Sequence, residues 1–445
     1  MAGRALAGRN LTAGNSAAGH SAARHPADGI GRRAARAAAA ATVAAFLASG
    51  LTWSLAPAPA AAAGVPCRTS GSFESWLEGV KAQARAEGVP NSAIEAGLAG
   101  VAYDPAIIRR DQGQGVFQQT LLTFAGRMVS NDRMVRGKKY LAQYSGVLSR
   151  IEATYGVPGE VLVAFWGLET DFGSDMGKYH APTAVATLAY DCRRADYFRP
   201  ELIDLLRIVA RGDLKPSEML GDWAGELGHL MFTPTDLYRY AADGDGDGDG
   251  RINVMRSVPD AFATGANFLR GLGWRRGEPW LEEVSVPADM DWSQADLENM
   301  LPRAAWSRMG VRTPAGGALA AGGPPAALLL PMGRNGPAFL AYPNFKAYLG
   351  WNKAMVYSTT AAYFAARLDG APAMSRGRAT VTPLTTEQMR HLQGLLRSAG
   401  FTRDAPDGRF GQGTRAAVRA AQMQLGLPAD GYPTPELLSA LEGRR

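Results

Sequence analysis

Apolar residues recur every three or four positions along most of the chain between about residues 67 and 370. The pattern is clearest in residues 73–89, 137–157 and 259–274, and each of these segments ends in glycine or in a turn. Such spacing predicts amphipathic helices. We therefore expect a mainly α-helical fold.

Two segments interrupt the helical pattern. Residues 310–336 are too rich in glycine and proline for a helix, and we expect an excursion within the domain with one short strand at residues 327–331. Residues 371–383 lack periodicity and are typical of a linker. The pattern thus predicts a domain over residues 67–370, this linker, and a small helical unit over residues 384–442.

The first 63 residues differ in composition from the rest of the chain. They hold six arginines, no lysine and one acidic residue, and an alanine-rich apolar run extends from about Ala37 to Leu55. An arginine-rich start, an apolar run and small residues near positions 59–64 are typical of a cleavable export signal, which places the protein in the periplasm. The alternative is an uncleaved leader that anchors the protein in the inner membrane, for which the run is short.

The formal net charge of +6 comes mostly from this leader. Residues 64–445 carry 41 basic and 40 acidic side chains, since six of the 47 basic and one of the 41 acidic residues precede them. This balance gives no case for nucleic-acid binding. We expect a monomer without a nucleic-acid partner.

The two cysteines of the chain, Cys67 and Cys192, both follow the leader. An oxidising compartment permits a disulfide between them, and two separate buried thiols are the alternative. The leader is followed by only three histidines, His180, His229 and His391, so the sequence has too few ligands for a zinc site.

A single carboxylate ends an otherwise apolar helical segment. Residues 158–169 predict a helix of about three turns, in which Val161, Phe165 and Leu168 share one stripe beside Glu169. A carboxyl group walled by Phe165 loses solvation when ionised, so we expect a raised pKa and a role as proton donor. A solvated glutamate paired with Lys178 is the alternative.

The C-terminal unit resembles the peptidoglycan-binding domain of many cell-wall enzymes. The resemblance rests on "LQGLLRSAGF", the sequence Asp407-Gly408-Arg409-Phe410-Gly411, "TRAAVRAAQ" and "LPADGYPTPELL", which together form a weak internal repeat. It implies a small three-helix peptidoglycan-binding domain. A generic three-helix packing module is the alternative.

Four motifs stand in order along the chain: residues 103–141, residues 163–198 beginning "VAFWGLETDFGSDMGK", residues 221–234 "GDWAGELGHLMFTP" and residues 344–364 "NFKAYLGWNKAMVYSTTAAYF". In this order they resemble the lytic murein transglycosylase B family, and the resemblance spans about residues 70–368. The resemblance implies a lysozyme-like α+β transglycosylase domain that cleaves the β-1,4 bond between N-acetylmuramic acid and N-acetylglucosamine of peptidoglycan without water. Glu169 would protonate the leaving oxygen and then deprotonate the muramoyl 6-hydroxyl, giving 1,6-anhydro products without a cofactor.

The resemblance also implies residues that bind substrate. Arg193 and Arg194 would line the groove and hold carboxylates of the substrate, with a helix-start salt bridge to an aspartate as the alternative. Asn352 and Tyr357 would bind N-acetyl groups and orient Glu169, or else serve core packing and capping. Trp351 is a candidate platform for sugar stacking, or a core residue.

Three residues depart from the family pattern. Asp222 stands where the family commonly has serine and Met231 where it has glutamine, both at substrate-binding positions that face Glu169, and Phe268 stands where the family often has tyrosine. Met231 would remove a hydrogen bond to substrate and so lower affinity or alter the subsite. Asp222 would place a second carboxylate near Glu169, so a hydrolytic muramidase becomes an alternative. The other alternative function is a catalytically weakened scaffold that binds the cell wall.

The repeat "DGDGDGDGRINV" is either a solvated low-complexity loop or a calcium loop. The preferred register takes Asp245, Asp247 and Asp249 as ligands, with the Arg251 carbonyl oxygen next. Arg256 stands at the last ligand position, but the resembling family has an expanded EF-hand-like loop that makes Asp260 the last ligand. The implied calcium ion, or else sodium, would be structural.

Glycan strands of peptidoglycan are the partner that these resemblances imply. The sequence leaves open a place in a cell-wall synthesis or secretion complex. It also leaves open the choice between action at chain ends and action within strands, the preference for stem peptides and the leader's cleavage site.

Overall fold

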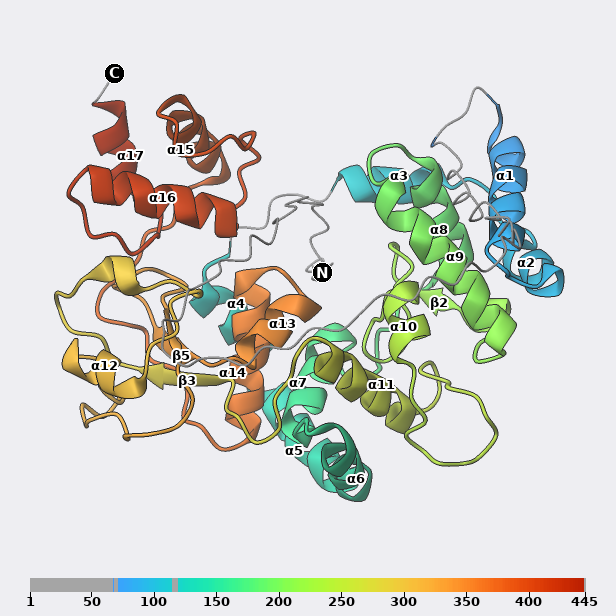
Figure 1. Cartoon of the computed structure of the whole chain (residues 1–445), viewed down its shortest axis with the longest axis horizontal. Helices are drawn as coiled ribbons and strands as arrows, with labels where there is room; N and C mark the ends of the chain where they lie inside the picture. Colours follow the sequence, from blue (N-terminus) through green and yellow to red (C-terminus); the bar gives the residue numbers. More distant parts are fainter. Residues whose placement is uncertain (1–66, 68–70, 114–118, 444–445) are drawn as a thin grey trace, which may run out of the picture. The chain divides into compact units, whose positions relative to one another are not determined.

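The computed structural model describes residue 67, residues 71–113 and residues 119–443, so the leader lies outside the described residues. Most of the described chain is helical, as predicted (Figure 1). None of the helices in this part of the chain is long and apolar enough to span a membrane.

The described residues between 71 and 370 fold mainly into short helices. They are α1 (Phe73–Ala86), α2 (Asn91–Leu98), α3 (Pro105–Gln112), α4 (Leu121–Met128), α5 (Asn131–Gln143), α6 (Ser145–Tyr155), α7 (Gly159–Glu169), α8 (Ala181–Tyr190), α9 (Ala195–Arg211), α10 (Pro234–Tyr240), α11 (Val258–Gly271), α12 (Arg303–Arg308), α13 (Phe345–Trp351) and α14 (Met355–Leu368), with 3-10 turns at Pro216–Glu218 and Trp292–Gln294. Two-residue strands β1 (Tyr179–His180) and β2 (Leu220–Gly221) pair antiparallel.

The three segments with clear helical periodicity, residues 73–89, 137–157 and 259–274, are helical, but only the first and the last each form a single helix. α1 follows Ser72, whose side chain accepts a hydrogen bond from the Ser75 amide. Residues 137–157 do not form one helix, because the chain turns at Tyr144 between α5 and α6. The Tyr144 ring packs edge-on against Trp166 and Phe262 at this turn.

Helix α7 is the central helix of the site and is apolar on all sides. Every residue from Val161 to Leu168 is buried, and α5, α6, α11 and α14 all contact the helix. The stripe of Val161, Phe165 and Leu168 is thus one side of a helix that is apolar all round and enclosed by its neighbours. Glu169 ends the most enclosed helix of this region.

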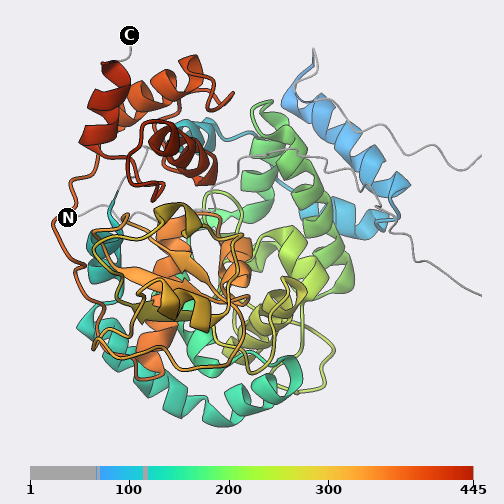
Figure 2. The ribbon, with the colours of Figure 1, turned by 60° about the vertical axis from the view of Figure 1, so that its left-hand side comes forward.

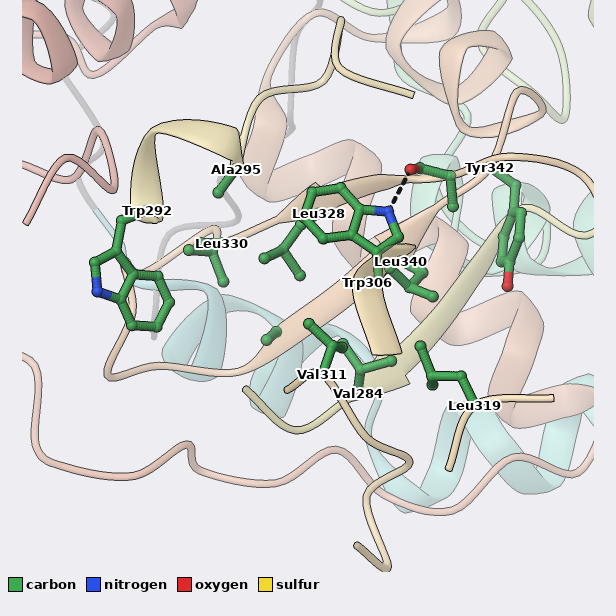
Figure 3. Close-up of a cluster of buried hydrophobic side chains, with 12 residues drawn as sticks. Val284, Trp292, Ala295, Trp306, Val311, Leu319, Leu328, Leu330, Leu340 and Tyr342 are labelled. Carbon is green, nitrogen blue, oxygen red and sulfur yellow. Dashed lines mark hydrogen bonds between the residues drawn. The ribbon is translucent and has the colours of Figure 1, made fainter. Parts of the chain in front are cut away.

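A small antiparallel sheet interrupts the helices. Strands β3 (Leu281–Val284), β5 (Ala338–Ala341) and β4 (Ala327–Leu329) lie in the order β3-β5-β4. The predicted strand at residues 327–331 is thus confirmed. Trp306 is fully buried in the cluster beside this sheet, and its Nε1 donates to the Ala326 carbonyl at 2.7 Å (Figure 3).

The C-terminal unit contains α15 (Thr386–Ser398), α16 (Gln412–Gln424) and α17 (Pro435–Glu442). Its internal repeat is built from matching hydrogen bonds. Gln393 donates to Asp407 at 2.9 Å and accepts from the Gly408 amide at 2.7 Å. Gln422 donates to Asp430 at 2.9 Å and accepts from the Gly431 amide at 2.8 Å. A glutamine thus fixes each Asp-Gly turn.

Residues 371–383, before this unit, are irregular, as a linker should be. Hydrogen bonds to residues of the preceding helical region hold them at several points. The Ser375 amide donates to Glu283 Oε1 at 2.7 Å, and the Arg378 guanidinium donates to the Pro287 carbonyl at 2.8 Å. In α16, Arg415 is half-buried and donates to the Leu330 carbonyl at 3.0 Å. Residues 371–383 thus have the irregular structure predicted for a linker, and they lie in one compact unit with the residues before and after them.

Candidate active site

Glu169 is held by side chains from α13 and α14. Trp351 Nε1 and Tyr357 Oη both donate to Glu169 Oε1, at 2.8 and 2.5 Å. Both donors are buried, whereas Glu169 itself is partly exposed. Two donors at one oxygen fix the orientation of the carboxylate at the end of α7.

Trp351 is part of the wall around Glu169 and not a platform for sugar. It is 1% exposed, and its ring stacks on Phe165 with centroids 4.2 Å apart. Phe232 and Phe268 pack against the same indole at 5.8 and 5.2 Å. The expected stacking role is therefore wrong, because aromatic neighbours surround the ring. Phe268 supports Trp351 from α11.

The residues after Glu169 are fixed by hydrogen bonds to the segment that follows β2. Thr170 Oγ1 donates to the His229 carbonyl at 2.7 Å and accepts from the Gly173 amide at 3.0 Å. Trp166 Nε1 donates to His229 Nδ1 at 3.1 Å, so the imidazole is an acceptor. Burial lowers the pKa of His229 to about 4, which keeps the ring neutral.

His229 is a neighbour of the site that the sequence did not predict, because no local pattern links it to Glu169. In the structure it fits closely against a glycine: a Cβ added to Gly173 would lie 2.6 Å from the imidazole. Gly173 also has φ +81°. Glycine at this position thus allows both the left-handed backbone and the close approach of the ring.

Two non-glycine residues of the same loop have left-handed backbone conformations. Asp171 has φ 51° and Phe172 has φ 60°. Asp171 accepts from Arg133 at 3.0 Å and from Arg136 at 2.6 Å, and these ion pairs hold the strained turn. The loop that follows Glu169 is thus a fixed part of the site.

Asp222 is buried in a tight turn. Its Oδ1 accepts from the backbone amides of Ala224 and Glu226, both at 2.9 Å. Burial raises the pKa of Asp222 to about 6, against the effect of these donors and of nearby Arg194. These contacts give the carboxylate a turn-stabilising role, and they weaken the expectation that it activates water.

Met231 lies in the same region with φ 50° and is 3% exposed. Its amide donates to the Gly228 carbonyl at 3.1 Å, inside a turn that Leu227 and Phe232 close by exchanging two hydrogen bonds of 2.8 Å. Asn352 is also buried, and its Oδ1 accepts from the Ala354 amide at 2.9 Å near the start of α14. This contact is the capping use that the sequence left open.

Arg193 and Arg194 both form ion pairs with Asp111 of α3. The Arg194 guanidinium also lies over the rings of Phe198 and Trp223, 4.7 and 5.7 Å from their centroids. Burial lowers the pKa of both arginines. The sequence offered Asp191 or Asp196 as the partner of the salt bridge, whereas Asp111 is the partner in the structure; Asp191 accepts from the Arg193 backbone amide at 3.0 Å.

The acidic loop gathers three carboxylates. Asp243, Asp245 and Asp260 place one oxygen each within 4.8 Å of one another. Asp260 is buried, and burial raises its pKa. The predicted ligands Asp245 and Asp260 are thus together, and Asp243 joins them although the chosen register leaves it out.

The other predicted ligands of this loop lie outside that group. Asp247 Oδ1 accepts from the Asp249 amide at 2.9 Å, and Asp249 Oδ1 accepts from the Arg251 amide at 2.7 Å. Each of these exposed aspartates therefore stabilises its own turn.

Cys67 and Cys192 form a disulfide, with Cα atoms 5.1 Å apart. The bond joins the segment before α1 to the turn between α8 and α9, directly before Arg193. The sequence-based pairing is confirmed.

Comparisons with known proteins agree with this geometry. A family model described as transglycosylase SLT domain matches residues 72–366, and a model of a peptidoglycan binding domain matches residues 385–441. SltB3 from Pseudomonas aeruginosa, solved in complex with NAG-anhNAM-pentapeptide and with NAG-NAM-pentapeptide, is similar at 38% identity. The match covers 83% of this chain and 99% of that chain, with a TM-score of 0.77.

Two further relatives are more distant. Soluble lytic transglycosylase SltB1 from Pseudomonas aeruginosa is 26% identical, over 66% of this chain and 99% of that chain, with a TM-score of 0.57. Membrane-bound lytic murein transglycosylase B of Escherichia coli (strain K12) is 32% identical over 169 residues, which is 38% of this chain. The chain spans 45% of the length of that relative. Because the SLT model covers most of the chain, the protein belongs to the lytic transglycosylase family with an SLT domain, and a peptidoglycan-binding domain follows it.

Proposed function

We propose that the protein is a lytic transglycosylase that cleaves the β-1,4 bond between N-acetylmuramic acid and N-acetylglucosamine in peptidoglycan, with Glu169 as acid and then base. The observation that carries the proposal is the carboxylate of Glu169, fixed by Trp351 and Tyr357 at the partly exposed end of a buried helix.

The chemistry needs one carboxyl group. Protonated Glu169 gives its proton to the glycosidic oxygen as the bond to muramoyl C1 breaks, and N-acetylglucosamine leaves with a free hydroxyl. The Glu169 carboxylate then takes the proton of the muramoyl 6-hydroxyl, whose oxygen bonds to C1 and closes the 1,6-anhydro ring. Ordinary glycosidases need a second carboxylate, but here the substrate supplies the nucleophile.

The other residues of the site bind and orient. Tyr357 and Trp351 stabilise the carboxylate form of Glu169 by donating to it. Arg193 and Arg194 bind substrate carboxylates, and their shared partner Asp111 holds the two guanidiniums side by side. The C-terminal domain raises the local concentration of the insoluble substrate.

Calcium fits the acidic loop as a structural ion. Asp243, Asp245 and Asp260 offer three carboxylate oxygens within 4.8 Å, which is the oxygen-rich donor set that calcium prefers. A bound ion neutralises their charge and ties the loop to α11, and it takes no part in bond cleavage. Without the ion, Asp260 holds the loop through the amides of Gly244 and Asn253, both within 2.9 Å.

The leader exports the protein, and the site of action is the periplasm. This proposal rests on the composition of residues 1–63 and on the disulfide, which requires an oxidising compartment.

Mass spectrometry of digested peptidoglycan tests the function. The wild type should release 1,6-anhydro-muropeptides, and Glu169→Gln should release none because it cannot donate a proton. Asp222→Asn keeps a carbonyl oxygen for the two backbone amides and should give the same anhydro products as the wild type. Reducing muropeptides that disappear in Asp222→Asn would instead show a muramidase, and anhydro products from Glu169→Gln at the wild-type rate would refute the role of Glu169.

A further inference from the structure

A cavity lies between α1, α9 and α10, and its lining residues are not among those that surround Glu169. It has a volume of about 410 Å³, and Glu87, Asp196, Arg199, Arg207, Tyr238 and Arg239 are among its lining residues. This volume is within the range of ordinary small-ligand sites. Most of the charged lining residues lie on α9, and Arg193 and Arg194 directly precede this helix.

The cavity is lined by three acidic and three basic side chains, and in the described part of the chain its ion pairs leave two of the arginines unpaired. Arg207 is satisfied, since it donates to Glu87 at 2.9 Å and to Asp204 at 2.7 Å. Among the described residues, Arg199 and Arg239 have no ion pair. Asp196 lies one helical turn before Arg199 and is exposed, and its negative charge acts on the Arg199 guanidinium.

Arg199 is the most unusual of these groups. Its Nε is buried and has no hydrogen-bond partner among the described residues. Burial also lowers the pKa of Arg199, so enclosing its charge is costly. A buried Nε–H group without an acceptor, on a partly exposed guanidinium at the wall of a cavity, fits an anionic ligand, and a carboxylate is such a ligand.

Asp196 adds a second requirement. An acid one helical turn from the open arginine favours a ligand with an ammonium group near its carboxylate, and Ile203, Pro200 and the Tyr238 ring give the cavity apolar surface for short aliphatic parts. Peptide stems of peptidoglycan, with free carboxylates and the amine of a diamino acid, have this combination.

We propose that this cavity binds the stem peptide of peptidoglycan, with a carboxylate on Arg199 and Arg239 and an ammonium on Asp196. The proposal rests on peptidoglycan being the substrate. It makes the cavity a specificity site for peptide-bearing strands, separate from the bond that Glu169 cleaves.

Calorimetric titration of the full chain with a free stem pentapeptide, lacking the disaccharide, tests the proposal. Arg199→Gln and Arg239→Gln should each weaken binding at least about tenfold, as expected for the loss of a charged hydrogen bond. The matched control is Arg150→Gln on α6, an exposed arginine outside the cavity that contacts only its own helix. Asp196→Asn should weaken binding of the peptide with a free side-chain amine and leave its acetylated form unaffected.

Activity gives an independent readout. Arg199→Gln should raise KM on peptide-bearing wall and leave turnover of peptide-free glycan strands unchanged. If Arg199→Gln and Arg239→Gln both bind peptide as Arg150→Gln does, the cavity proposal is wrong even when the wild type makes anhydro products. If the wild type makes no such products but the binding differences remain, the proposed function fails and the peptide site stands. Arg239 is exposed, so its variant keeps the test valid if Arg199→Gln does not fold.

Discussion

Tyr357 and Tyr348 are both buried beside the apolar wall of Glu169, but their hydroxyl groups differ in their partners. Tyr357 Oη donates to Glu169 at 2.5 Å. Tyr348 stacks on Phe165, and its hydroxyl has no hydrogen-bond partner in the described part of the chain. The Tyr357 hydroxyl therefore acts in the site, whereas burial of the Tyr348 hydroxyl without a partner lowers the stability of the fold.

Tyr357→Phe should lower turnover by about ten- to a hundredfold, because a hydrogen bond to a charged group contributes about 1.5 to 3 kcal/mol. The rate of anhydro-muropeptide release measures the change. Tyr348→Phe is the control and should keep full activity while raising the free energy of unfolding by about 1 kcal/mol. Equal losses of activity in both variants would mean that Tyr357 acts only through packing.

His229 makes stability depend on pH. Its pKa is about 4 in the folded protein against 6.5 as the ordinary value, so the unfolded chain binds a proton at higher pH than the folded chain does. The folded state should therefore lose up to about 3 kcal/mol as pH falls from the upper to the lower value. His229→Gln keeps an acceptor for Trp166 and does not titrate.

Denaturant unfolding of the wild type and His229→Gln between pH 7 and pH 4 should show the wild type losing stability relative to the variant. Asp222, with a pKa raised to about 6 by burial, affects stability in the opposite direction over part of this range. Because it is present in both proteins, its contribution cancels in the difference. Parallel stability curves would contradict a buried neutral His229.

At the scale of elements, the loop after α7 depends on glycines with little space around them. Gly177 has φ +84°, and a Cβ there would lie 2.0 Å from the Gly221 carbonyl oxygen, beside the β1–β2 pair. Gly212 has φ +85°, and an added Cβ would meet nothing within 4 Å. The two glycines share a backbone conformation and differ in their surroundings.

Gly212→Ala should cost about 1 to 2 kcal/mol, the ordinary penalty of a left-handed alanine. Gly177→Ala should cost at least about 3 kcal/mol, because steric displacement of the β1–β2 pair is added to the same penalty. Thermal unfolding measures both, and Gly177→Ala should also reduce turnover because this loop follows Glu169. Equal destabilisation would show that the loop relaxes freely around the added methyl group.

Periodicity predicted the elements well where one face of a helix is buried, as in α1. It was less successful for α7, which is enclosed on all sides, and at Tyr144, where tertiary packing breaks a continuous pattern into two helices. The site could be predicted as far as Glu169 and Tyr357. Asp111, His229 and the burial of Trp351 depend on contacts between distant segments, which no local pattern specifies.

At the scale of the whole molecule, the disulfide closes a long loop. Cys67 and Cys192 are 125 residues apart in sequence, so the bond restricts a large part of the unfolded chain. The double variant Cys67→Ser/Cys192→Ser should lose about 2 to 5 kcal/mol of unfolding free energy. The same loss should appear when a reductant is added to the wild type, as followed by denaturant unfolding.

The double variant in the presence of reductant is the control, and its stability should not change. A wild type that is insensitive to reductant, with the bond shown to be reduced by thiol labelling, would mean that noncovalent packing alone fixes the segment before α1.

The hydrogen bond from Trp351 to Glu169 gives the protein a built-in spectroscopic reporter. The chain has nine tryptophans, so selective ¹⁵N labelling of the indoles yields few peaks to assign. The Trp351 indole proton points directly at the carboxylate, 2.8 Å from nitrogen to oxygen, so its chemical shift will follow the charge of that group. The ionisation of Glu169 can thus be titrated in the resting enzyme, with no substrate and no turnover.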